Sequence, residues 1–340
     1  MAKKVIFDKK NVLVAGGAGF IGSHLCDELI KTYKVICVDN FVTGSENNID
    51  HLLSNPDFVF INHDLSIPLD LEAIPDLEKF KIQFQGVQEI YNVACPLSPR
   101  HFLDNRIKIL DANSLVMHNL LELAVKNEAK FLHFSSSVVY GSRNFNNEAH
   151  KVKEEEIGSV DILSERSCYD EGRRFAETMV NCYKDFYKLD AKIIRLFRVY
   201  GPRMSLNDDQ LIPDMIAAAL DNRDLEIFGD RNFSSSFCYV EDAIDGACKM
   251  MNSELSGPIN IGSDVDVNLT DLANMIISET ESSSQITYVD RKLFISELLL
   301  PDIYKARNEL SWMPVVTLKN GLKKTIFSLQ ANNRLQGFNG

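Results

Sequence analysis

The chain has 340 residues, of which 45% are hydrophobic and 25% are charged, so it can bury the core of one or two domains. Its formal net charge of −12 argues against nucleic acid as a partner, because no basic surplus is available to neutralise phosphates. Seven cysteines occur without a C-x-x-C pair, and an odd number favours a reducing compartment over a disulfide framework.

Membrane insertion and secretion are not expected from the sequence. The apolar run Val12 to Ile21 is too short to span a bilayer and contains glycines. The segment Met1 to Lys10 lacks the apolar core of a signal peptide. We therefore expect a cytoplasmic protein with no membrane partner.

Short apolar strands alternate with helical stretches over the first 200 residues. Strands are expected at Asn11–Ala15, Lys34–Asp39, Phe58–Ile61, Glu89–Val93, Lys130–Phe134 and Lys192–Val199. Helices are expected at Ser23–Lys31, Asn105–Asn127 and Cys168–Tyr187. This alternation predicts an α/β fold with a Rossmann, doubly wound parallel sheet.

Beyond residue 200 the elements become shorter and are separated by Pro, Gly and Asp, as at Gly201-Pro202 and Gly229-Asp230. We expect residues 201–330 to form a smaller α+β lobe, with a segment near 236–250 returning to the first domain. The charged run Lys151 to Glu156 is expected to be a solvated loop.

Three glycines follow the first strand at the spacing G-x-x-G-x-x-G: Gly16, Gly19 and Gly22. Without side chains, the backbone N–H groups and the helix N-terminus can approach a pyrophosphate. Asp39 ends the second strand about twenty residues later, where a carboxylate accepts hydrogen bonds from ribose hydroxyls and repels a 2′-phosphate. The pattern predicts that residues 1–200 bind NAD rather than NADP.

Several runs resemble the extended short-chain dehydrogenase/reductase family, the NAD-dependent epimerases and dehydratases, and most of all its UDP-glucuronate decarboxylases. The matching runs are Gly16 to Leu25, Asp39 to Gly44, Asn62 to Asp64, Ser98-Pro99, Cys168 to Gly172, Ala176 to Thr178, Gly201 to Met204 and Pro301 to Ile303. The resemblance implies modification of a nucleotide sugar through a transient keto intermediate. It also implies a homodimer, in which the helices Asn105–Asn127 and Cys168–Tyr187 pair with their copies as a four-helix bundle.

The resemblance and the glycine pattern together give the expected cofactor contacts. They are Gly16, Gly19, Phe20, Ile21, Gly22, Asp39, Asn40, Thr43, Gly44, Asp64, Leu65, Val93, Ala94, Cys95, Asn113, Tyr169, Arg173 and Val199. The seven histidines show no H-E-x-x-H or comparable spacing, so we expect no metal site.

Tyr169, Ser136 and Arg173 are the expected catalytic residues. In the family a tyrosine takes the proton of a sugar hydroxyl while hydride passes to NAD, and Tyr169 matches it. Arg173 occupies the position of the family's lysine; it keeps the positive charge but has a different shape. Ser136, near the end of a strand, matches the residue that hydrogen-bonds the reacting hydroxyl. We expect impaired or altered chemistry at this site.

The substrate half departs from the decarboxylases. Val138 stands where decarboxylases and dehydratases have an acidic residue, which argues against dehydration. The other changed positions are Asp70, Asp111, Arg198, Gln210, Ser235 and Leu299. The expected substrate contacts are Ser136, Pro99, Arg198, Arg203 and Ser235, and a new phosphate clamp could form from Arg100, Arg198, Arg203 and Arg231.

Three functions remain open at this point. The first is a decarboxylase-like enzyme with an altered substrate site, and the second is a C4 epimerase of sugar nucleotides. The third is a non-catalytic, NAD-binding regulatory protein. Val138 and Ser235 favour epimerisation over decarboxylation, whereas the overall resemblance favours decarboxylation.

Overall fold

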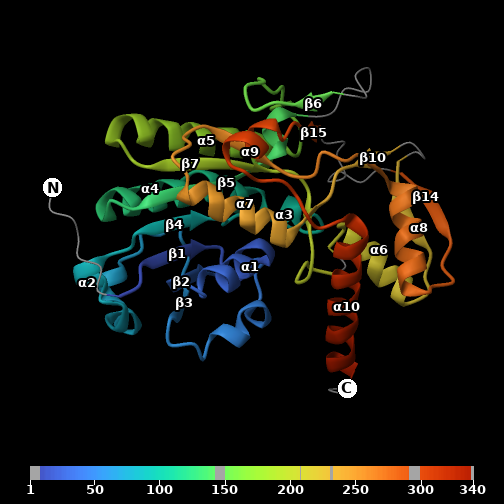
Figure 1. The fold of residues 1–340 in the computed structure, drawn as a ribbon, viewed down its shortest axis with the longest axis horizontal. Helices are drawn as coiled ribbons and strands as arrows, with labels where there is room; N and C mark the ends of the chain where they lie inside the picture. The colour runs from blue at the N-terminus through green and yellow to red at the C-terminus, as the bar shows by residue number, and fades with distance from the viewer. Residues whose placement is uncertain (1–7, 142–149, 207, 230–232, 291–298, 338–340) are drawn as a thin grey trace.

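The structure is a computed structural model, and it describes residues 8–141, 150–206, 208–229, 233–290 and 299–337. Its centre is a sheet of seven strands (Figure 1). The strands are β1 (Asn11–Ala15), β2 (Lys34–Asp39), β3 (Phe58–Asn62), β4 (Glu89–Asn92), β5 (Lys130–Ser136), β7 (Ala191–Leu196) and β12 (Pro258–Ile261). Their order is β12-β7-β5-β4-β1-β2-β3, and every neighbouring pair is parallel.

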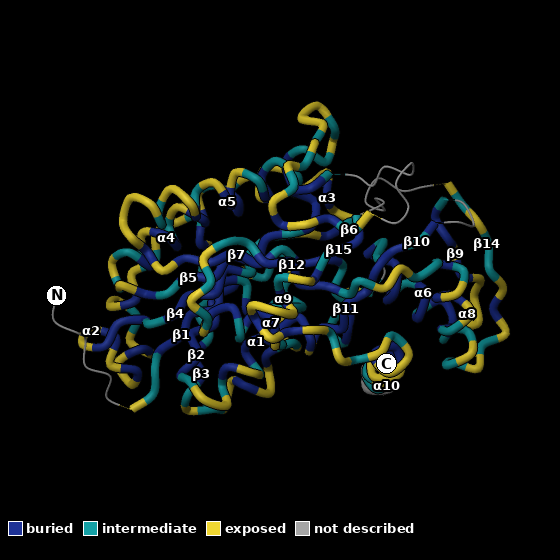
Figure 2. The backbone as a smooth tube through the Cα atoms, turned by 45° about the horizontal axis from the view of Figure 1, so that its top comes forward, coloured by how far each residue is buried: buried dark blue, intermediate teal, exposed yellow. Residues whose placement is uncertain are grey.

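Helices cover both faces of this sheet, as Figure 1 shows. On one face lie α3 (Phe102–Asn113), α4 (Leu115–Asn127) and α5 (Ser167–Tyr187); on the other lie α1 (Phe20–Leu29) and α7 (Val240–Asn252). In β1, Val12 and Val14 belong to one apolar core, whereas Leu13 and Ala15 belong to the other. Figure 2 accordingly shows buried strands between helices whose outer sides are exposed. The expected doubly wound α/β fold is confirmed.

The remaining elements are short or lie after residue 198. They are α2 (Ile82–Gln85), β6 (Lys151–Val152), β8 (Val199–Tyr200), α6 (Leu211–Leu220), β9 (Leu225–Phe228), β10 (Ser234–Ser235), β11 (Cys238–Tyr239), β13 (Val267–Asn268), α8 (Leu269–Thr280), β14 (Ile286–Val289), β15 (Leu300–Pro301), α9 (Tyr304–Glu309) and α10 (Leu318–Gly337). The helices α6 and α8 and the parallel pair β9–β14 form a smaller unit beside the sheet (Figure 1). Within the described ranges, no helix is both long and apolar enough to cross a lipid bilayer.

The expected single helix Asn105–Asn127 is wrong, because the chain breaks into α3 and α4 at Ser114. The backbone of Ser114 has φ −126° and ψ −76°, outside the helical region. The Ser114 hydroxyl donates to the carbonyl of Leu110, and the Asn113 amide donates to that of Ile109. Short polar side chains compete with the helix for its backbone in this way.

One further expectation needs correction, and one strand of the central sheet was missed. The run from Lys151 to Glu156 is not simply a solvated loop: Val152 is buried in β6, which pairs with β15, and the buried Glu154 accepts a hydrogen bond from the backbone N–H of Asn260. The strand β12 was not expected at all. It extends the central sheet beyond β7, although it lies more than sixty residues later in the sequence.

Candidate active site

A cleft of about 1450 Å³ opens at the carboxyl ends of the central strands. It lies where the strand order reverses between β1 and β4, the place where such sheets bind ligands. Of the residues expected in the cofactor, catalytic and substrate sites, these line it: Gly16, Gly19, Phe20, Ile21, Gly22, Asp39, Asn40, Thr43, Asp64, Leu65, Val93, Ala94, Cys95, Pro99, Ser136, Tyr169, Arg173, Arg198, Val199 and Arg203. Gly44, Asn113 and Ser235 do not line it.

The glycine loop forms a cradle at one end of the cleft. Gly16 has φ +78°, a conformation that glycine adopts without strain. A Cβ atom on Gly22 would come within 2.1 Å of the carbonyl oxygen of Gly16, so no larger residue fits there. The first turn of α1 therefore starts directly against the loop, and its backbone N–H groups are left for an anion in the cleft.

Asp39 ends β2 beside this cradle. The residue is 9% exposed, and its carboxylate accepts hydrogen bonds from the backbone N–H of Phe41 (2.8 Å) and of Ala18 (3.0 Å). Burial raises the pKa of Asp39, and the two backbone N–H groups oppose that rise. Gly44 lets the loop lie close to the carboxylate, since a Cβ atom there would lie 2.9 Å from Oδ1. Cradle and carboxylate fit the diphosphate and the ribose of a dinucleotide.

Two more of the expected cofactor contacts are Asp64, which lines the cleft, and Asn113, which does not. Asp64 lines the cleft and accepts a hydrogen bond from the backbone N–H of Ser66, which holds the pKa of Asp64 below its usual value. Asn113 is buried behind the cleft, where its side chain packs against Gly172. It touches helix α5 and does not line the cleft.

Tyr169 and Arg173 lie one helical turn apart at the start of α5, each only 6% exposed. The guanidinium carbon of Arg173 is 5.4 Å from the centre of the Tyr169 ring. Its Nη1 donates to the carbonyl oxygen of Phe134 on β5 (3.1 Å). Burial lowers the pKa of Arg173, but Cys95 and Tyr169 beside it outweigh that effect and raise it. The site therefore holds a permanent positive charge against the tyrosine.

Ser136 and Val138 lie where β5 ends. The hydroxyl of Ser136 accepts a hydrogen bond from the backbone N–H of Val138 (3.4 Å), at the start of a 3-10 turn. Val138 itself is buried in an apolar cluster with Phe102, Ile109 and Tyr169. Val138, where decarboxylases and dehydratases are expected to have an acidic residue, is thus part of the apolar packing around Tyr169.

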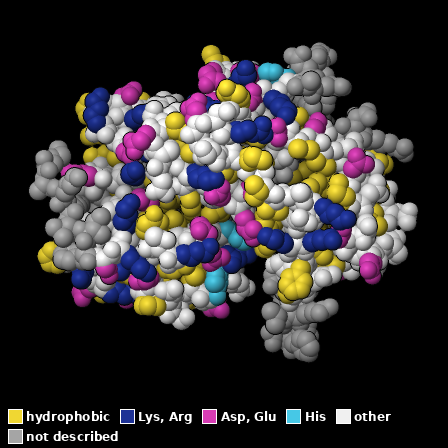
Figure 3. Space-filling model, viewed as in Figure 1, with side chains coloured by type: hydrophobic (Ala, Val, Ile, Leu, Met, Phe, Trp, Pro, Cys, Tyr) yellow, Lys and Arg dark blue, Asp and Glu magenta, His cyan; other side chains and the backbone are white. Residues whose placement is uncertain are grey.

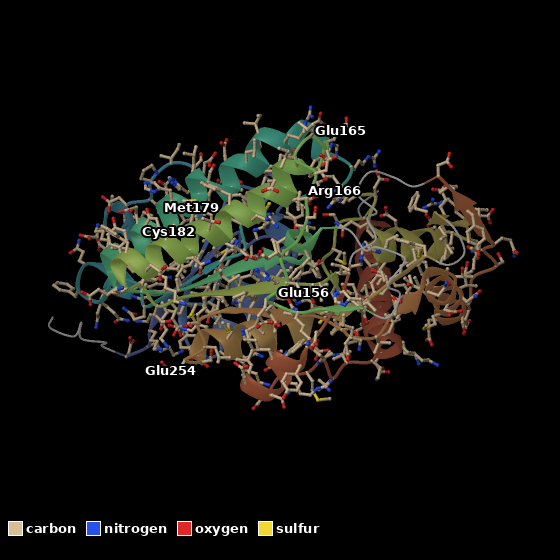
Figure 4. The ribbon with its side chains drawn as sticks, turned by 90° about the horizontal axis from the view of Figure 1, so that it is seen from above. Glu156, Glu165, Arg166, Met179, Cys182 and Glu254 are labelled. Atoms are coloured by element: carbon tan, nitrogen blue, oxygen red, sulfur yellow. The ribbon has the colours of Figure 1, made fainter. Side chains whose placement is uncertain are left out.

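Arg166 and Arg198 are among the arginines that line the cleft. Nε of Arg198 donates to the hydroxyl of Ser235 (3.0 Å), so Ser235 supports Arg198 from behind instead of lining the cleft. Burial, together with the charge of Arg166, lowers the pKa of Arg198 to about 10. Arg166 precedes α5, as Figure 4 shows, and forms an ion pair with Asp170 (3.1 Å). Arg166 was not predicted; its place one turn before Tyr169 is the signal that could have identified it.

Asp208 also lines the cleft without having been predicted. Its carboxylate accepts hydrogen bonds from the Ser98 hydroxyl, the backbone N–H of Arg100 (3.4 Å) and the Gln210 amide (3.1 Å). It therefore ties the loop after β4 to the segment before α6. Only contacts between distant segments reveal this role.

The remaining arginines of the expected phosphate clamp, and the positions that differ from the decarboxylases, do not all line the cleft. Arg203 lines the cleft but forms an ion pair with Asp27 (2.7 Å), while Arg231 lies outside the described residues. Asp111 and Gln210 line the cleft; Asp70 caps a 3-10 turn, and Leu299 packs in an apolar cluster. In the described ranges, no three His, Cys, Asp or Glu side chains are grouped as metal ligands would be.

Acidic and basic side chains alternate over the described part of the face in Figure 3. The net negative charge is therefore not gathered into one patch on that face. The cleft is likewise lined by both arginines and aspartates, among them Arg173, Arg198, Asp39 and Asp208.

Comparisons with known proteins agree with this geometry. The family model described as "NAD dependent epimerase/dehydratase family" matches residues 12–262. The chain is 36% identical to UDP-glucuronic acid decarboxylase 1 of Xenopus tropicalis over 334 residues, covering 96% of this chain and 75% of the relative. It is 36% identical to the decarboxylase of the same name from Arabidopsis thaliana, covering 93% and 68%.

Solved structures are similar over almost the whole chain. UDP-glucuronic acid 4-epimerase from Bacillus cereus, in complex with UDP-glucuronic acid and NAD, superposes with a TM-score of 0.80 at 27% identity, covering 95% of this chain and 99% of the epimerase. An epimerase from Methanothermobacter thermautotrophicus superposes with a TM-score of 0.83 at 27% identity, covering 97% and 94%. The chain belongs to the NAD-dependent epimerase/dehydratase family.

Proposed function

We propose that this protein is an NAD-dependent enzyme that modifies a nucleotide sugar through a transient keto intermediate. The observation that carries the proposal is the burial of Tyr169 and Arg173 against each other in the cleft that also contains the glycine cradle and Asp39. The similar proteins are decarboxylases and epimerases of UDP sugars, which supports the same class of reaction.

The cofactor end of the cleft would hold NAD. The loop from Gly16 to Gly22 and the first turn of α1 would bind the diphosphate, and Asp39 would accept hydrogen bonds from a ribose. Asp64 and Leu65 would border the adenine, and Val93 to Cys95 the rest of the cofactor. Bound NAD would supply a reversible hydride acceptor beside the sugar carbon.

The residues of the chain then handle the proton. Tyr169 takes the proton of the sugar hydroxyl, Ser136 holds that hydroxyl by a hydrogen bond, and Arg173 stabilises the negative tyrosinate. Loss of both the proton and the hydride converts the alcohol to a ketone. The adjacent cleft residues Pro99, Arg198 and Arg203 would contact the nucleotide sugar.

This proposal is tested by measuring the turnover of nucleotide sugars by the wild type and by the variant Tyr169→Phe. Nucleotide sugars are first screened with NAD by thermal shift, because a ligand that binds only the folded state stabilises it by mass action. Products of the ligands that bind are then followed by NMR. Tyr169→Phe should lose roughly 10²- to 10⁴-fold in kcat while it still binds NAD. An equally active Phe variant would show that the tyrosine is not the base.

The reaction after oxidation is either decarboxylation of a uronate or epimerisation at C4. The apolar packing of Val138 favours epimerisation, since no acid stands there to move a second proton. The decarboxylase relatives favour the other outcome. Incubation with UDP-glucuronate separates the two, because decarboxylation alone releases carbon dioxide.

We also propose a homodimer formed through α3 and α5. These helices pack side by side and carry exposed apolar side chains: Leu103, Ile107 and Leu110 on α3, and Phe175 on α5. The three on α3 follow helical spacing along one stripe, and Ile107 is 69% exposed. Sedimentation at micromolar concentration should give a dimer for the wild type and a monomer for Ile107→Glu.

A cytoplasmic location is a further proposal. Its support is the odd number of cysteines, several of which, such as Cys26 and Cys238, are buried as thiols. A fluorescent fusion of the full chain, followed in cells, tests it. Fluorescence inside a membrane-bounded compartment would contradict it.

A further inference from the structure

Two hydrogen bonds join the end of β5 to the helix α5. The first runs from Nη1 of Arg173 to the carbonyl oxygen of Phe134. The second runs from the hydroxyl of Ser135 to Oε1 of Glu177, at 2.6 Å. Both Ser135 and Glu177 are buried, and neither has a role in the proton transfer described above.

Glu177 is itself held firmly. The guanidinium of Arg195 on β7 donates to both of its oxygens, at 2.9 Å and 2.7 Å. Nη1 of Arg195 donates in addition to the Tyr140 hydroxyl (2.7 Å) and to the carbonyl oxygen of Glu154 (2.9 Å). A bidentate, buried pair of this kind has a single geometry.

The network continues into the late part of the chain. The Tyr140 hydroxyl donates to Oδ1 of Asn260 on β12 (2.7 Å). The Asn260 amide donates to the carbonyl oxygens of Val152 (3.0 Å) and Asp302 (3.2 Å). The side-chain polar atoms of Ser135, Glu177, Arg195, Tyr140 and Asn260 thus form one connected array, and a fully satisfied buried network is rigid.

We propose that Ser135 and Glu177 are positioning residues, whose hydrogen bond sets the distance between the two elements that carry Ser136 and Tyr169. Ser135 is the chain neighbour of Ser136, and Glu177 lies two helical turns beyond Tyr169 on the same helix. Because a helix moves as a rigid body, fixing Glu177 against β5 and β7 fixes Tyr169. This inference rests on the proposed function, in which Ser136 and Tyr169 act on the same hydroxyl.

The test uses Ser135→Ala, which removes this bond and leaves the ion pair of Glu177 and Arg195 in place. Ser135→Thr retains a hydroxyl, and Thr178→Ala is the control. Thr178 follows Glu177 on α5, and its hydroxyl bonds to Arg174 of the same helix. Small misplacements of reacting groups lower the rate of the chemical step, so kcat of Ser135→Ala should fall about tenfold. Its KM values for NAD and sugar nucleotide should stay within about twofold of wild type.

Ser135→Thr should recover most of the lost kcat, and Thr178→Ala should match the wild type. The inference is overturned if Ser135→Ala keeps the kcat of the wild type, or if its KM rises while kcat stays unchanged. It is also overturned if Ser135→Thr folds as well as the wild type and has the kcat of Ser135→Ala. Each of these results would assign Ser135 another role.

A second measurement is independent of turnover. 3-Fluorotyrosine is incorporated, and the ¹⁹F resonance of residue 169 is assigned from its absence in Tyr169→Phe. In Ser135→Ala that resonance should move or broaden, whereas in Thr178→Ala it should not. If no nucleotide sugar is turned over, the proposed function fails, and this resonance still decides the positioning role. An unchanged resonance in Ser135→Ala contradicts that role.

Discussion

The guanidinium of Arg173 lies over the ring of Tyr169, with its central carbon 5.4 Å from the ring centre, and is fixed by its bond to Phe134. The family resemblance implies a lysine at this position. The guanidinium of Arg173, whose pKa is raised, keeps its charge at alkaline pH values at which an ammonium group loses its own. The electrostatic support of the tyrosinate is therefore independent of pH in this protein.

Arg173→Lys should make the alkaline limb of kcat steeper. An ammonium group titrates at lower pH than a guanidinium, since their ordinary pKa values are about 10.4 and about 12.5. As the pH rises through the pKa of the lysine, the variant loses the positive charge and with it the activity. The wild type should retain its rate over the same range. Profiles of kcat against pH check this, and superimposable profiles would contradict it.

Asp39→Asn should weaken NAD binding by about 10- to 100-fold, the usual effect of losing a hydrogen bond to a charged group. The wild type should also bind NAD less well as the pH falls. Burial raises the pKa of Asp39, so the carboxylate is lost at milder acidity than in an ordinary aspartate. The Asn variant should lack this pH dependence. Isothermal titration at several pH values measures both effects; pH-independent binding by the wild type would argue against the assigned contact.

Gly22→Ala should abolish NAD binding at cofactor concentrations that saturate the wild type. The added methyl group would come within 2.1 Å of the Gly16 carbonyl, so the cradle would have to open. Gly257→Ala is the matched control, because the nearest atom to its methyl group is the end of the flexible Lys305 side chain at 3.3 Å. Fluorescence titration with NADH measures both variants. Equal affinities for the two would mean that the cradle is not the binding site.

Removal of either partner of the pair Glu177–Arg195 should destabilise the protein strongly. The shortest contact of the pair is 2.7 Å, and both side chains are nearly buried. Glu177→Leu or Arg195→Met leaves one buried charge uncompensated and should lower the free energy of unfolding by about 3–5 kcal/mol. The double variant should lose less than the sum of the two. Urea denaturation measures all three, and strict additivity would show that the pair is not coupled.

Much of the fold was open to prediction from local patterns. The strands β1 and β2 were predicted with their observed bounds, because they are buried on both faces and read as continuous apolar runs. The break at Ser114 was missed, since the helical spacing continues through it. The strand β12 was missed because it is short, and its partner β7 lies far from it in the sequence.

The sequence by itself determined the glycine cradle, Asp39 and the pair Tyr169–Arg173. Each depends on spacing within one strand, one turn or one helix, and such spacing fixes geometry locally. Tertiary structure alone decided that Ser235 supports Arg198, that Asp208 ties two loops together and that Glu177 meets Ser135. Those contacts join segments from 37 to 110 residues apart. Only the packing of the complete sheet and its helices brings such segments together.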